Sequence, residues 1–153
     1  MFTTILVALD GSDHANHALT VAMDLAEKYS ANLLLLTAVQ PIYLSSGGFY
    51  PSTAKVMRDI AETQKKDSEQ VLAKAQTHVK KGNLTIQVAT KLVEGRPADV
   101  IIATAQEESV DLIVMGSRGR GGIKQLVLGS VSDRVADGAP CPVLIVRKTI
   151  TNT

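Results

Sequence analysis

The sequence has 153 residues, a formal net charge of +1 and one cysteine. A chain of this length fits one domain over residues 1–153, and it buries roughly two-thirds of its unfolded surface without needing a disulfide or a metal. The near-neutral charge excludes a general attraction to nucleic acid or membranes, and no stretch reaches the roughly 20 apolar residues of a membrane span. We therefore expect a cytoplasmic protein without a signal peptide, in which any positive charge acts locally.

Short apolar runs alternate along the chain with segments of helical spacing. Strands that are covered on both faces have such nearly continuous aliphatic runs, and these strands are usually parallel. The alternation predicts an α/β fold, in which a parallel sheet joined by right-handed crossovers lies between helices. In chain order the expected strands are residues 5–9, Asn32–Val39, 84–93, 110–115 and Val143–Val146, and the expected helices are residues 14–29, 54–81, 97–106 and 130–137.

Local signals predict where the helices begin and end. Ser12 or Asp13 is a suitable N-cap for the first helix, and Gly82 is expected to end the second. Pro97 suits the first turn of the third helix, where its missing N–H is not needed. The long stretch of residues 40–53 is either a lid or a solvated connection without a role.

The loop after the fourth expected strand has an unusual composition for a connection. The segment MGSRGRGGIKQLVLGS, residues 115–130, contains five glycines, two arginines and a lysine. Glycines let backbone N–H groups approach an anion closely, and the start of the next helix favours phosphate. Arg118, Arg120 and Lys124 supply countercharge, while Ser130 and Ser132 supply hydroxyl groups. The loop therefore suits a polyphosphate, and the alternative is a flexible surface loop with basic side chains.

Asp10, at the end of the first expected strand, is the candidate partner of this loop. Ligands of open parallel sheets bind beyond the carboxyl ends of the strands, where the strand order reverses. If the first and fourth strands are neighbours, Asp10 faces the same crevice as the loop, although it could instead help to cap the first helix. Asp13, His14 and His17 raise the alternative of a transition-metal site, but no further ligand of the right type at a fixed spacing supports it.

The spacing of glycine and serine in the loop resembles the signature of a known family. Gly116, two residues, Gly119, nine residues and then Gly129-Ser130 match the pattern G-x2-G-x9-G-[ST] of the ATP-binding universal stress proteins. The segments ILVALDGSDHA, EGRPADVII and CPVLIVR look like other parts of that family, so the resemblance covers nearly the whole chain. It implies a three-layer α/β/α fold of the adenine nucleotide alpha hydrolase-like kind, with five parallel strands in the order 3-2-1-4-5.

The resemblance also implies a ligand and its contacts. Nucleotide-binding members of the family hold ATP with a divalent cation, Mg²⁺ or Mn²⁺, and Asp10 matches the acidic residue near the ribose or the metal. Ala8 and Leu9 match positions that line the adenosine, and Val39 matches the position whose backbone meets adenine. The phosphate and ribose contacts match Gly116, Arg118, Gly119, Gly129, Ser130, Val131 and Ser132, and Met115 is a further cofactor-binding position.

Two expectations about assembly and activity complete this interpretation. Members of the family form homodimers through the last strand, here Val143–Val146, whereas an ordinary edge strand in a monomer is the alternative and a tetramer of dimers is another. ATP hydrolysis usually needs a general base, and Asp10 is the only acidic candidate at the crevice. We therefore expect a nucleotide-dependent regulator with an unidentified protein partner. A slow ATPase or nucleotidyl-transfer enzyme and a structural protein with a vacant crevice are the alternatives.

Overall fold

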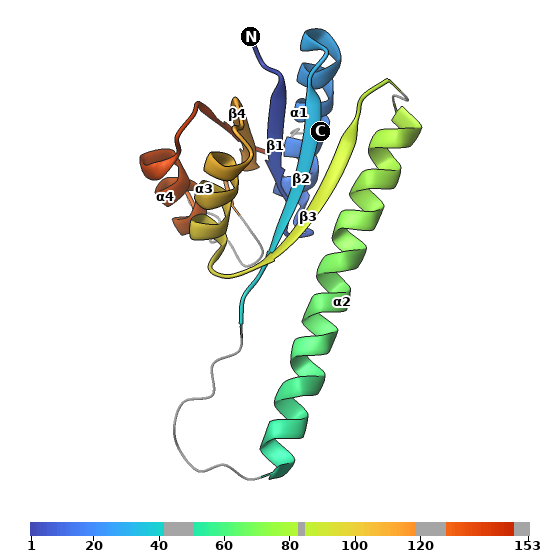
Figure 1. Ribbon diagram of the computed structural model, residues 1–153, viewed down its shortest axis with the longest axis vertical. Helices are drawn as coiled ribbons and strands as arrows, with labels where there is room; N and C mark the ends of the chain where they lie inside the picture. Colours follow the sequence, from blue (N-terminus) through green and yellow to red (C-terminus); the bar gives the residue numbers. More distant parts are fainter. Residues whose placement is uncertain (42–50, 83–84, 119–127, 149–153) are drawn as a thin grey trace, which may run out of the picture.

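A computed structural model of the chain describes residues 1–41, 51–82, 85–118 and 128–148. It contains a five-stranded parallel sheet in the order β3-β2-β1-β4-β5, so the predicted fold class is confirmed (Figure 1). The strands are β1 (Thr4–Ala8), β2 (Asn32–Val39), β3 (Val88–Glu94), β4 (Leu112–Gly116) and β5 (Val143–Val146), and the helices are α1 (Asp13–Tyr29), α2 (Pro51–Gly82), α3 (Pro97–Glu107) and α4 (Ser130–Gly138).

Several element boundaries differ from those expected. The apolar run predicted as the third strand begins at residue 84, but β3 starts only at Val88, which pairs with Leu33 of β2. Ile86 is nevertheless buried. An apolar run indicates that its residues are buried, whereas a strand also requires backbone hydrogen bonds to a neighbouring strand. Helix α2 begins at Pro51 rather than at residue 54, since proline is tolerated in the first turn of a helix.

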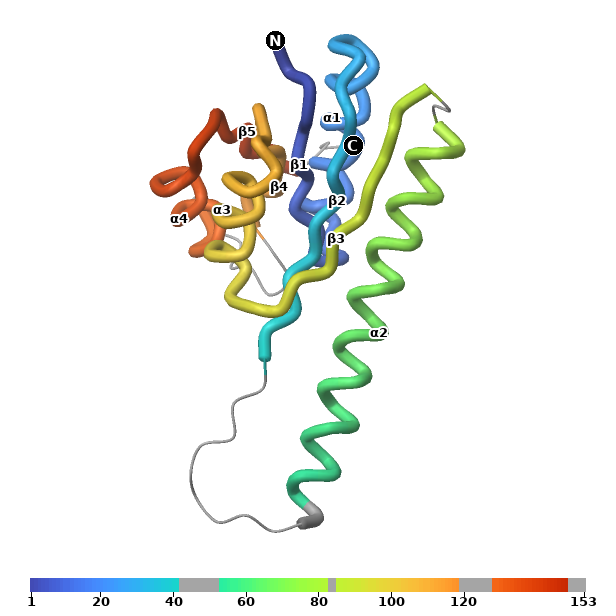
Figure 2. Tube along the Cα trace, in the orientation of Figure 1, coloured from blue at the N-terminus to red at the C-terminus, as the bar shows by residue number. Residues whose placement is uncertain are grey.

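Helices cover both faces of the sheet and create two cores (Figures 1 and 2). Ile5 and Val7 of β1 pack with α1 and α2 on one face, whereas Leu6 packs with α3 and α4 on the other. All three side chains are fully buried, because successive residues of a strand point to opposite faces. This arrangement explains why the central strands have continuous rather than alternating apolar sequences.

Helix α2 is longer than the sheet is high. Its 32 residues extend about 48 Å, whereas the eight residues of β2 extend only about 26 Å. Its N-terminal half therefore projects past the carboxyl ends of the strands, as Figures 1 and 2 show. Among the helices in the described part of the chain, none has both the length and the apolar character of a membrane span.

Asp111 lies at the amino ends of the strands, where it links the start of β4 to the start of β1. Its Oδ2 accepts hydrogen bonds of 2.9 Å from the backbone N–H groups of Thr3 and Thr4. The bond from Thr4, followed by that from Thr3, lowers the pKa of Asp111, because backbone donors stabilise the charged form. A lowered pKa in the folded state contributes stability that is present above the pKa of the unfolded chain and is lost as pH falls through the folded value.

We expect Asp111→Asn to reduce the dependence of stability on acidic pH. At neutral pH the cost should stay below about 1 kcal/mol, because the half-buried carboxylate is still partly screened by solvent and the amide oxygen still accepts hydrogen bonds. Denaturant unfolding at a series of acidic pH values measures the effect. Asp137→Asn, an exposed change near the end of α4, should keep the wild-type profile. An unchanged acid profile in Asp111→Asn would contradict this account.

Candidate functional site

The turn between β1 and α1 is held by two short polar contacts. Asp10 Oδ1 accepts a hydrogen bond of 2.9 Å from the N–H of Ser12, and Ser12 Oγ accepts one of 3.2 Å from the N–H of Ala15. Ser12 is therefore the N-cap of α1, which confirms one of the two predicted caps. Asp10 supports the turn without being the cap, and it is exposed at the carboxyl edge of the sheet.

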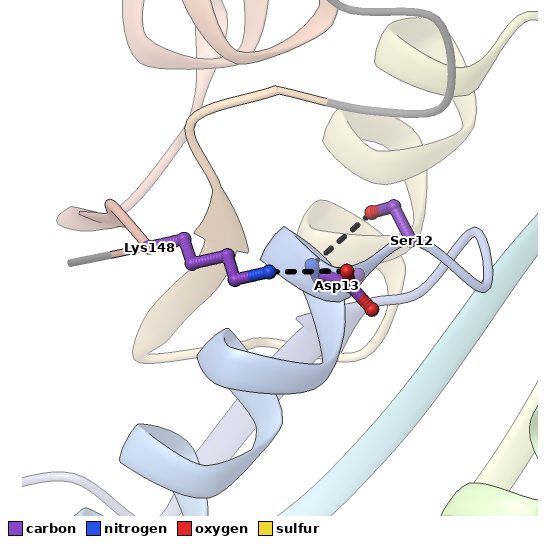
Figure 3. Close-up of polar contacts among 4 residues, drawn as sticks. Ser12, Asp13 and Lys148 are labelled. Carbon is purple, nitrogen blue, oxygen red and sulfur yellow. Dashed lines mark hydrogen bonds and ion pairs between the residues drawn. The ribbon is translucent and has the colours of Figure 1, made fainter. Parts of the chain in front are cut away.

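Asp13 takes part in an ion pair with Lys148. Its Oδ2 lies 3.1 Å from Lys148 Nζ, which links the first turn of α1 to the segment after β5 (Figure 3). Both side chains are exposed, so the pair contributes at most about 1 kcal/mol. Within the described residues no three His, Cys, Asp or Glu side chains are grouped to hold a metal, so the alternative of a site at Asp13, His14 and His17 gains no support there.

The end of β4 and the start of α4 are joined by hydrogen bonds to one carbonyl group. The oxygen of Ser117 accepts a bond of 2.9 Å from the N–H of Gly129 and one of 3.0 Å from Ser132 Oγ. Ser132 is buried and also donates at 3.0 Å toward the oxygen of Gly129, so its hydroxyl holds the junction together. Gly129 is the N-cap of α4 and has no side chain, so it provides no side-chain cap, and among the described residues none is recorded as capping the first N–H groups of α4.

Gly116 allows β4 to approach α1 closely. A Cβ atom at this position would lie 2.8 Å from both the carbonyl carbon and the Cβ of His14. The glycine thus has a packing role that the signature alone did not reveal, and it brings the Asp10 turn next to the β4–α4 junction. Arg118 follows Ser117 and is half-buried. Gly119, Arg120 and Lys124 lie outside the described residues, as does most of the segment 40–53.

A pocket of about 210 Å³ opens beyond the carboxyl ends of β1 and β2. Two predicted ligand contacts, Asp10 and Val39, belong to its lining. The carbonyl of Val39 already accepts a hydrogen bond of 2.9 Å from the N–H of Gly95, so part of its backbone is engaged. The other lining residues were not predicted, and they are Thr37, Ala38, Gln40, Gln64, Asp67, Ser68 and Val71.

The remaining predicted contacts lie close to the edge but do not turn their side chains toward one cavity. Leu9 packs into the core under α1 and α2, whereas Met115 is buried in the core under α3 and α4. Ala8 and Val131 are half-buried against that second core, and Ser130 is exposed. These residues can therefore meet a ligand mainly through their backbone, with the exception of the Ser130 hydroxyl.

An open parallel sheet with a pocket at its carboxyl edge defines a doubly wound α/β protein, a class in which ligands commonly bind at that edge. The sequence profile of the Universal stress protein family matches residues 1–147. The chain belongs to this family, and its fold is the adenine nucleotide alpha hydrolase-like fold of the family.

Individual relatives agree with this assignment. The universal stress protein in the QAH/OAS sulfhydrylase 3′ region of Thermus aquaticus is 42% identical over 149 residues, which is 96% of this chain and all of that protein. Universal stress protein UspA from Lactobacillus plantarum has a similar structure, with a TM-score of 0.82 and 28% identity over 95% of this chain and 98% of that one. A universal stress protein solved in complex with cAMP has a TM-score of 0.67 and 27% identity over 97% and 98% of the two chains.

Proposed function

We propose that this chain is a nucleotide-dependent regulator of the stress response that binds ATP together with Mg²⁺ or Mn²⁺. The observation that carries the proposal is the position of two complementary features at one edge of the sheet. The pocket with Asp10 lies at the end of β1, and the uncapped start of α4 follows the neighbouring strand β4. The structure of a relative in complex with cAMP supports an adenine nucleotide as the class of ligand.

Each end of the site suits a different part of the nucleotide. Free N–H groups at the start of α4 favour phosphate, because the helix dipole and the unsatisfied donors point in the same direction. Arg118 provides countercharge beside them, and the predicted contacts of Gly119 belong to the same phosphate end. Asp10 would hold the ribose or the cation, since a divalent ion on a nucleotide needs only one or two carboxylates besides phosphate oxygens.

We favour binding and signalling over catalysis. Asp10 is the predicted acidic group nearest to the phosphates, and it already accepts a hydrogen bond from Ser12. A bound ribose or cation would engage the remaining oxygen of this carboxylate, which leaves Asp10 poorly suited to take a proton from water. Binding energy can instead shift the protein toward a form that a partner recognises. In this proposal the chain acts as one domain in the cytoplasm.

We also propose a homodimer formed through β5. This strand ends the sheet order, and Leu144 at its centre is 37% exposed. Val143 and Ile145 are only half-buried. Pairing with a twofold copy would satisfy the open edge and cover these apolar side chains.

Native mass spectrometry of the purified protein tests the ligand and the assembly together. We expect a dimer mass with bound adenine nucleotide, and a rise in the thermal midpoint when ATP and Mg²⁺ are added. ATP at a hundred times its dissociation constant stabilises the folded state by about 2.7 kcal/mol, which corresponds to roughly 5–11 °C for a domain of this size. No bound nucleotide and no shift at millimolar ATP would contradict the proposal. Phosphate or pyrophosphate release far above the uncatalysed rate in single-turnover experiments would favour an enzyme.

A further inference from the structure

The carboxyl end of β5 is connected to both parts of the proposed nucleotide site. The N–H of Ser117 donates a hydrogen bond of 2.9 Å to the oxygen of Val146, the last residue of β5. Two residues further along the chain, Lys148 Nζ lies 3.1 Å from Asp13 Oδ2 in the first turn of α1 (Figure 3). One connection therefore leads to the β4–α4 junction, and the other leads to the turn that carries Asp10.

Ser117 links β5 to the start of α4. Its N–H binds β5, while its oxygen accepts the hydrogen bonds of 2.9 Å from the N–H of Gly129 and 3.0 Å from Ser132 Oγ. Ser117 and Ser132 are only 6% and 2% exposed, so the low local dielectric strengthens these hydrogen bonds. A displacement of Ser117 would therefore act on the end of β5 and on the first turn of α4 together.

The ion pair of Asp13 and Lys148 makes a second connection, which reaches the Asp10 turn. Asp13 directly follows Ser12, the N-cap of α1 whose N–H donates to Asp10 Oδ1. The Asp13 and Lys148 side chains are 76% and 51% exposed, so solvent and salt weaken their attraction. This connection is weaker than the one through Ser117, but it ends at a different part of the site.

Strand β5 is the element on which pairing with a second copy of the chain would act. It has four residues and pairs only with β4 in the described part of the chain. Short segments with few contacts open locally at a low cost in free energy. A second copy paired along β5 would restrict this motion and hold Ser117 and Lys148 in place before a nucleotide arrives. The nucleotide would then need to order less of the protein, which favours its binding.

We infer that Ser117 and Lys148 are positioning residues that couple nucleotide binding to dimerisation, so that ATP tightens the dimer. The inference rests on the nucleotide-binding function and on the β5 dimer proposed above. The coupling is reciprocal, because both effects are differences between the same binding free energies. A dimer holds two nucleotides, so its dissociation constant falls by the square of the factor by which each site gains affinity.

Dimer dissociation constants measured with and without ATP and Mg²⁺ test the coupling in the full-length protein. Analytical ultracentrifugation over a range of concentrations gives both constants. We expect ATP to lower the constant of the wild-type protein about tenfold, near the lower end of usual couplings. Lys148→Gln and Ser132→Ala should each reduce the effect to about threefold. Lys148→Gln should keep the ATP affinity of the monomer, because Lys148 lies outside the pocket.

Lys91→Gln is the matched control, because it removes a partly exposed ion pair, with Glu108, at the β3 edge of the sheet. It should keep the full effect of ATP. Wild-type coupling in both Lys148→Gln and Ser132→Ala would overturn the inference, as would a wild-type dimer that ATP does not tighten or an equal loss of coupling in Lys91→Gln. The proposed function would stand in each of these cases. A wild-type protein that binds no ATP would overturn the proposed function and the coupling together.

Discussion

Gly116→Ala is expected to destabilise the protein by about 2 kcal/mol, within the range found for overpacked sites. The new Cβ would lie 2.8 Å from the carbonyl carbon and the Cβ of His14, and 3.0 Å from its carbonyl oxygen. These atoms belong to the first turn of α1, so they cannot rotate away without moving the helix. The strain therefore acts on the contact between α1 and the end of β4, next to the Asp10 turn.

Thermal and denaturant unfolding measure this effect, and about 2 kcal/mol corresponds to a fall of roughly 4–8 °C in the midpoint. Gly82→Ala is the matched control. Its Cβ would also lie 2.8 Å from another atom, but that atom is Cε of Met23, the end of a flexible side chain. Stability should then change by less than about 0.5 kcal/mol, because methionine adapts to its surroundings. Equal effects of the two substitutions would show that Gly116 has no special packing role.

The layered fold could be predicted because burial on both faces affects every residue of the central strands. The five residues of β4 and residues 33–37 of β2 are all buried, and nearly all of them are apolar, so these runs are visible without any tertiary information. The order of the strands in the sheet could not be derived in this way, because no local sequence pattern indicates which strands are neighbours. It came from the family resemblance, and the pairing of β1 with both β2 and β4 confirms it.

The candidate site could be predicted only where the chain itself carries a local signature. The glycines marked the β4–α4 loop, but the sequence could not show that Gly116 packs on His14 or that Ser132 is buried at the junction. The α2 wall of the pocket was missed altogether. Its polar residues resemble any solvated helix face until the length of α2 and its path past the end of β2 are known, and those are properties of the tertiary structure.

Ser130→Asp is expected to weaken ATP binding at least about a hundredfold while leaving the free protein as stable as before, or slightly more stable. Ser130 is exposed at the first position of α4, directly after the uncapped Gly129. An aspartate there interacts favourably with the helix dipole, by about 0.3–1 kcal/mol. The same carboxylate would occupy the N–H groups assigned to phosphate and repel a triphosphate in a partly desolvated site.

The two opposite effects make this substitution more informative than a simple deletion. A variant that merely misfolds would lose stability and binding together, whereas this one should lose binding alone. Ser130→Asn is the control, because it has the same shape without the charge and should retain most of the ATP affinity. Calorimetric titration with ATP and Mg²⁺, together with the thermal midpoint of the free protein, measures both quantities. If the aspartate and asparagine variants bind ATP equally well, the phosphates do not lie at the start of α4, and the proposed orientation of the nucleotide is wrong.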